Sequence, residues 1–115
     1  MKKIDANQLH ALNNRVHEKV FGQGNGYFIR ECSSNLSEAF EALDQIDRDY
    51  QTSDFSLSRD YEGIWSVKLR LAGEPAVWLD GFPPAIAICL ATLAVKGDKE
   101  WIDNWIKKGS NSEKV

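Results

Sequence analysis

The segment from Ala85 to Val95 constrains the fold of this chain more than any other part of the sequence, because it is almost wholly apolar. Pro83 and Pro84 precede it, and proline suits the first turn of a helix, where the missing N–H needs no partner. A helix without a polar face is buried on all sides. The sequence therefore predicts a central helix, ended near Gly97, on which the other elements pack.

Three amphipathic helices are predicted around this segment. The first starts after Asp5 and ends near Gly22, the second starts after the capping cluster Ser33, Ser34 and Asn35, and the third is a short helix after Gly97. Apolar residues recur in each at spacings of three and four, so that one stripe faces a core. These stripes are Leu9, Leu12, Val16 and Val20; Leu36, Ala39, Phe40, Leu43 and Ile46; and Trp101, Ile102, Trp105 and Ile106.

The hydrophobic period changes to two between residues 55 and 79, which is typical of strands with one buried face. Short turns separate three such runs, which start at Phe55, Trp65 and Pro75, and they predict an antiparallel meander. We expect Trp65 and Trp78, on adjacent strands, to fill the core. Tyr27 to Ile29 are predicted as a further short extended piece.

The predicted fold class is α+β, with a three-stranded antiparallel meander sandwiched between helices in α/β/α layers and the element order α-α-β-β-β-α-α. A chain of 115 residues has the size of one domain. We predict a single domain over 1–115, with a core from about residue 4 to 108 and a frayed tail over 109–115.

Charge and composition exclude several classes of partner. The chain carries 14 basic and 17 acidic residues, mixed along its length, so it lacks the clustered Lys and Arg of a nucleic-acid-binding protein. No apolar run reaches the ~20 residues that span a bilayer, and the N-terminus lacks the apolar run of a signal peptide. We therefore predict neither nucleic acid nor membrane as a partner, and a cytoplasmic location.

The residues that could perform chemistry do not form a recognisable set. His10 and His17 are seven residues apart, about 10 Å along a helix, and are interpreted as surface histidines near Asn13 and Asn14. Cys89 lies in the apolar segment and suits core packing, and Cys32 is given a structural role with both thiols reduced. The sequence predicts no enzyme, no metal site, no cofactor and no catalytic residue.

Two segments resemble a known family. The run Ser33–Leu36, with Ala39, Phe40 and Glu41 after it, is similar to the Tyr-Ser-Thr-Asp motif and following helix of the phage ABA-sandwich domain, in which an aromatic residue packs on the sheet. Pro83 and Pro84, followed by Ala87, Ile88, Cys89 and Ala91 to Leu93, resemble that family's late Ala-Ile-Cys helix. The matched region runs from about Tyr27 to Lys96. Cys32, Asn35, Phe40 and Leu90 depart from the family's usual Tyr, Asp, Trp and Arg.

This resemblance implies an antiparallel sheet between helical layers and a phage or prophage origin, and it implies no activity. The first hypothesis is therefore a non-enzymatic phage accessory protein that binds a host protein or a second copy of itself. A short terminal helix cannot bury two indoles alone, so Trp101 and Trp105 must dock either on their own domain or on such a partner.

The alternative hypothesis is a protein that binds or sequesters a small nucleotide-like ligand. Its predicted site combines Gly24 and Asn25 of the Gly22–Gly26 loop with Ser33, Ser34 and Asn35 at a helix N-terminus, where backbone N–H groups attract phosphate. The loop lacks both the dinucleotide fingerprint and the Gly-Lys-Ser/Thr ending of a Walker loop, so a plain connector is the competing interpretation.

Overall fold

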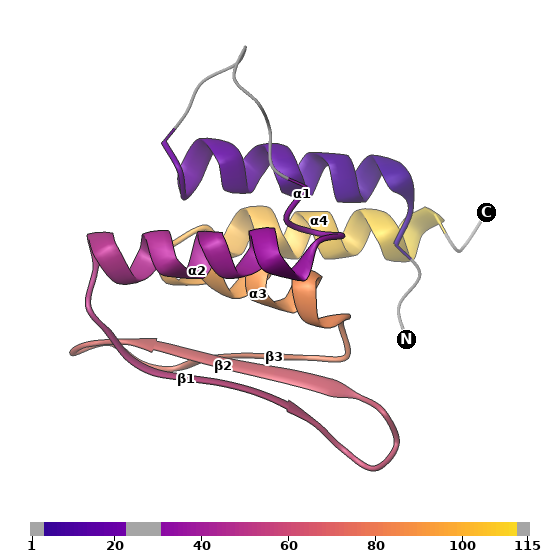
Figure 1. Cartoon of the computed structure of the whole chain (residues 1–115). Helices are drawn as coiled ribbons and strands as arrows, with labels where there is room; N and C mark the ends of the chain where they lie inside the picture. Colours follow the sequence, from indigo (N-terminus) through magenta and orange to yellow (C-terminus); the bar gives the residue numbers. More distant parts are fainter. Residues whose placement is uncertain (1–3, 23–30, 113–115) are drawn as a thin grey trace.

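Helix α3 (Pro84–Val95) lies in the middle of the fold, in contact with α1, α2, α4 and two of the three strands. The computed structural model describes residues 4–22 and 31–112, which form four helices and one antiparallel sheet (Figure 1). The remaining elements are α1 (Ala6–Lys19), α2 (Leu36–Asp49), β1 (Thr52–Arg59), β2 (Trp65–Leu71), β3 (Val77–Asp80) and α4 (Lys99–Ser112).

Every residue of α3 from Ala85 to Ala94 is buried, as its uniform apolar sequence predicts. Its neighbours explain why no polar face is needed. The sheet covers one side, α2 packs beside it, and α1 and α4 cover the side away from the sheet. Thr92 is its one polar buried residue, and the hydroxyl donates to the carbonyl oxygen of Cys89 at 2.7 Å, so the polar group is satisfied inside the helix.

The α+β class, the meander and the order of elements are confirmed, but the layers differ from the α/β/α expectation. Figure 1 shows all four helices on the same side of the sheet, with α2 and α3 next to it and α1 farthest from it. Helix α3 is apolar all round because a second helical layer covers its far side, rather than because the sheet has helices on both faces. None of the described helices covers the other face of the sheet, which we call the uncovered face.

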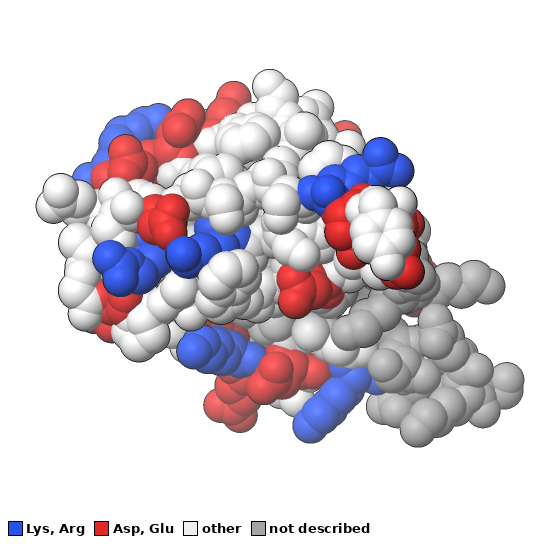
Figure 2. Space-filling model, turned by 90° about the horizontal axis from the view of Figure 1, so that it is seen from below, with Lys and Arg blue, Asp and Glu red and all other residues white. Residues whose placement is uncertain are grey.

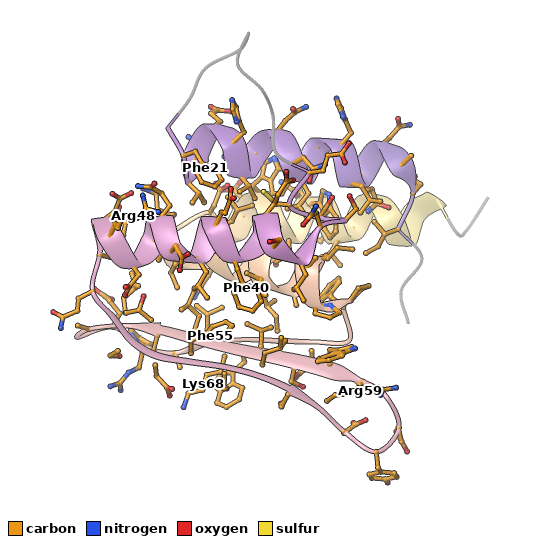
Figure 3. The ribbon with its side chains drawn as sticks, in the orientation of Figure 1. Phe21, Phe40, Arg48, Phe55, Arg59 and Lys68 are labelled. Carbon is orange, nitrogen blue, oxygen red and sulfur yellow. The ribbon has the colours of Figure 1, made fainter. Side chains whose placement is uncertain are left out.

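The strands form the sheet order β1-β2-β3, with Leu57 opposite Val67 and Val67 opposite Leu79. These apolar residues face the helices, where Phe55 meets Phe40 of α2 edge to face at a ring-centroid distance of 6.1 Å (Figure 3). Lys68 points away from the helices in the same view. The alternation of strand side chains thus separates an apolar face from a polar one.

The expectation that Trp78 fills the core is wrong, because its side chain is 61% exposed on the uncovered face. Val77 and Leu79 occupy the inward positions of β3, and period two then forces the residue between them outward. Trp65 is half-buried on the inward side, with the guanidinium of Arg59 5.9 Å from its ring centroid. Figure 2 shows that basic and acidic side chains are scattered over the uncovered face among uncharged ones.

The helix ends follow the capping residues that the sequence contains. Asp5 caps α1 in a reciprocal pair with Gln8, and Asn35 caps α2 by accepting from the N–H of Glu38. Helix α4 continues to Ser112, past Gly109, where the sequence predicts the end of the ordered core. A glycine inside a helix costs only about 1 kcal/mol, so it need not end one.

No helix among the described residues has the length and apolar character required to cross a membrane. The predicted extended piece from Tyr27 to Ile29 lies outside the described residues.

Candidate functional site

An open pocket of about 730 Å³ lies where α2, α3 and the β2–β3 turn come together, at the left-hand end of the molecule in Figure 1. This volume is within the range of sites that hold small molecules. Leu71, Val77, Ala94 and Val95 form the apolar lining, and all four belong to the core or pack against it. We call this site the Tyr50 pocket, because Tyr50 lines it at the end of α2.

The polar part of the Tyr50 pocket consists of five side chains: Tyr50, Gln51, Glu74, Lys96 and Lys99. The ammonium of Lys96 donates to the hydroxyl oxygen of Tyr50 at 3.0 Å and lies 5.0 Å from the centroid of the same ring. The phenol hydrogen and the remaining ammonium hydrogens are still available to a ligand. The pocket therefore offers an apolar lining together with hydrogen-bond donors.

The end of α3 positions these lysines through the backbone. Gly97 has a φ of +89°, a left-handed conformation that glycine adopts without strain, and its N–H donates to the carbonyl of Ala94. The N–H of Asp98 donates to the carbonyl of Leu93, which completes a Schellman motif. The chain turns sharply here, so that Lys96 and Lys99 both line the Tyr50 pocket while Asp98 lies between them in the sequence.

Asp98 is held away from these lysines by an ion pair with Arg15 of α1. The guanidinium donates two hydrogen bonds to the carboxylate, each 2.7 Å long, and the Asp98 side chain is only 15% exposed. The hydrogen bonds from Arg15 lower the pKa of Asp98 below its ordinary value and raise the pKa of Arg15. The pair joins α1 to the link between α3 and α4.

At the ligand site predicted from the sequence, Ser33 and Asn35 already have hydrogen-bond partners within the chain. The backbone N–H of Ser33 donates to the side-chain oxygen of Asn13 at 2.9 Å, and the Asn35 side chain caps α2. The carboxylate of Glu38 also reaches back to the backbone N–H of Glu31, which places a negative charge at this helix start. Ser34 is exposed, and Gly24 and Asn25 lie outside the described residues.

The two tryptophans of α4 dock on their own domain. Trp105 is buried, its indole N–H donates to the carbonyl of Gln8 at 2.8 Å, and the Gln8 side chain donates to the carbonyl of Trp105 at 3.1 Å. Trp101 stacks on Trp105 and is half-buried beneath the guanidinium of Arg15. Trp105 is therefore part of the core, and of the predicted interface pair only Trp101 keeps some exposed surface.

The expectation of a polar histidine surface on α1 is wrong for His17, which is 3% exposed, although His10 is exposed. Asn13 is also buried, one turn before His17 on the same stripe, where it bonds to Ser33. This stripe faces the segment before α2 rather than solvent. Neither ring nitrogen of His17 has a hydrogen-bond partner in the described part of the chain.

Cys32 and Cys89 are brought together in the core, although they are distant in the sequence. Both are free, as predicted, and both are buried, although burial was predicted for Cys89 alone. Burial, aided by the Cys32 thiol, raises the pKa of Cys89 well above its ordinary value. A thiol with a raised pKa is a poor nucleophile, so the pair is suited to packing.

No metal-binding group of three His, Cys, Asp or Glu side chains exists within residues 4–22 and 31–112. The Tyr50 pocket was missed by the sequence analysis, which named no candidate residue among Tyr50, Lys96 and Lys99. Its signal was present in Lys96 and Lys99 on either side of a helix-ending glycine, but nothing in the sequence places Tyr50 beside them.

No protein-family model, curated protein or solved structure matches this chain. The resemblance to the phage ABA-sandwich family therefore stays a prediction, and the argument for function depends on the Tyr50 pocket.

Proposed function

We propose that this chain is a binding protein rather than an enzyme, and that it holds a small, largely apolar molecule in the Tyr50 pocket. One observation carries the proposal: a ligand-sized concavity of about 730 Å³ is lined by a group of apolar side chains together with a few polar ones. This is the small-ligand class predicted from the sequence, at a different place from Gly24, Asn25 and Ser33–Asn35.

A short-chain alcohol tests the apolar part of the proposal. 1-Octanol has a chain that fits the apolar lining and no charge, and its binding raises the melting temperature by several degrees because a ligand stabilises the state that binds it. We expect Ala72→Trp, at an exposed position that lines the pocket, to abolish this rise by filling the space.

Ser56→Trp is the matched control, because Ser56 is an exposed position on β1 that does not line the pocket. It should keep the full rise in melting temperature. A rise that survives Ala72→Trp, or the absence of any rise in the unchanged protein, would refute the Tyr50 pocket as a ligand site.

Protein binding, including the accessory phage role predicted from the sequence, is the second candidate function. The exposed indole of Trp78 on the uncovered sheet face favours it, because large exposed aromatic side chains are enriched at interfaces. If two copies pair through this face, light scattering gives a mass that rises with concentration from 13.0 kDa towards twice that value, and Trp78→Ser prevents the rise. A constant monomer mass excludes this pairing.

A further inference from the structure

We infer that the ligand of the Tyr50 pocket carries one negatively charged head group, a carboxylate or another small oxyanion, attached to an apolar chain. This inference rests on the proposed function, since it names the ligand class of the same pocket. It follows from the charged groups around the pocket, because its two lysines form no ion pair with a described carboxylate while the neighbouring Asp98 is paired with Arg15.

The charged lining groups are two lysines and one glutamate, which leaves the pocket with a net positive charge at neutral pH. Neither Lys96 nor Lys99 forms an ion pair with a described carboxylate, and the described partner of Lys96 is the uncharged hydroxyl of Tyr50. An ammonium without a counter-charge beside an apolar lining favours an anion.

The nearest acidic residue in the sequence does not supply the missing counter-charge. Asp98 lies between Lys96 and Lys99, but both of its oxygens accept hydrogen bonds from Arg15 at 2.7 Å. The Schellman turn at Gly97 thus separates the charges: the Asp98 carboxylate pairs with Arg15 of α1, and the two ammonium groups line the pocket. Glu74 alone opposes them from the β2–β3 turn.

Tyr50 adds a second donor in a suitable place. Its oxygen already accepts from Lys96, so its own hydrogen is free to donate, and a bound oxyanion can accept from the phenol and the ammonium together. The apolar part of such a ligand would cover Leu71, Val77 and Ala94. An amphipathic anion therefore matches both halves of the pocket.

Three eight-carbon probes separate the head group from the chain: octanoate, 1-octanol and octyltrimethylammonium, each titrated calorimetrically into the full chain. We expect octanoate to bind about tenfold more tightly than 1-octanol, the effect of one charge-assisted hydrogen bond at a partly exposed site. Added salt should weaken octanoate binding and leave that of 1-octanol unchanged. The cationic probe should bind most weakly.

Lys96→Met is expected to remove the octanoate advantage while 1-octanol keeps its affinity. Lys68→Met is the matched control, because Lys68 also lies over an aromatic ring but on the uncovered sheet face. Melting temperatures of both variants show that the fold is retained. Equal affinities for octanoate and 1-octanol would overturn the head-group inference and leave the proposed function standing. Tightest binding of the cation would overturn it as well, and binding of none of the probes would overturn both.

Discussion

Arg15 on the helical side and Lys68 on the uncovered sheet face make the same pair of contacts. Each lies 2.7 Å from a carboxylate oxygen, of Asp98 and Asp54 respectively, and each lies over an indole, with distances to the ring centroid of 5.5 Å for Trp101 and 5.1 Å for Trp78. The surroundings differ. The Asp98 side chain is 15% exposed, whereas that of Asp54 is 43% exposed and Trp78 stands largely in solvent.

Identical contact distances therefore do not imply equal contributions to stability. An exposed ion pair is screened by water and salt and must also order two side chains, so its net effect is small. The Arg15 pair is bidentate and joins α1 to the link between α3 and α4, in a region where Gln8 and Trp105 exchange hydrogen bonds. The comparison shows that the contribution of an ion pair to stability depends on how deeply it is buried and on how firmly its two side chains are held in place.

The largest predicted difference concerns the indoles. Trp105→Ala empties a buried site and breaks the hydrogen bond to Gln8, and should lower the free energy of unfolding by about 3–5 kcal/mol. Trp78→Ala should change it by no more than about 0.5 kcal/mol. Urea unfolding followed by circular dichroism measures both. Comparable losses would mean that Trp78 is covered in solution, and the contrast between the two regions would be lost.

The next largest predicted difference in unfolding free energy is between substitutions of the two acidic residues, Asp98 and Asp54. Asp98→Asn keeps the shape of the side chain but removes its charge, and should cost about 1–2 kcal/mol because Arg15 loses two charge-assisted hydrogen bonds at a partly buried site. Asp54→Asn is the matched change at the exposed pair and should have a much smaller cost. The same unfolding experiment decides, and an equal effect of the two substitutions would contradict the comparison.

Acid should remove the contribution of Asp98. Because its pKa is lowered in the folded state, the stabilisation is fully present above the unfolded value of about 3.9 and is lost as pH falls through the folded pKa. The stability gap between the natural chain and Asp98→Asn should therefore be constant from about pH 7 to pH 5 and shrink below about pH 4. A gap that is unchanged at about pH 3 would show that charge is not its cause.

The smallest predicted effect is the salt response of the exposed pair. At low ionic strength Lys68→Met should lower the melting temperature slightly, and about 1 M salt, with a screening length of about 3 Å, should abolish that difference. The cost of Asp98→Asn should persist better in salt, since the pair is shielded from solvent. If both differences disappear together, the two pairs are equally solvated.

Lys96 also places a cation over an aromatic ring, that of Tyr50. Unlike Arg15 and Lys68, it has no carboxylate partner among the described residues. Lys68 and Arg15 pair with acids of this chain, whereas Lys96 lies beside a ligand-sized pocket. The difference between Lys68 and Lys96 is the reason for using them as control and test residues in the binding experiment.

Local patterns in the sequence were sufficient to predict the helices and strands. The uniform apolar run from Ala85 to Val95 predicted a buried hub, and Asp5 and Asn35 predicted helix starts through their capping oxygens. Period two predicted which face of β1 and β2 is apolar. It was misapplied to Trp78, where size was weighed above alternation with Val77 and Leu79.

The candidate site could not be predicted in the same way. Tyr50 and Lys96 are 46 positions apart, and Arg15 and Asp98 are 83 apart. Their meeting depends on where α2 ends relative to the Schellman turn after α3 and on which side of α3 the helix α1 packs. A repeating pattern reports how much of a helix is buried, but it does not report the neighbour that buries it.

The sequence by itself determined the type and order of the elements and the central place of α3, because capping, turn formation and periodic burial are set by residues close together in the chain. Only the tertiary structure decided that all four helices lie on one side of the sheet, that His17 is buried and that Cys32 meets Cys89. These outcomes depend on which face of each helix or strand packs against the rest of the protein. That choice is made by packing across the whole fold, which also forms the Tyr50 pocket.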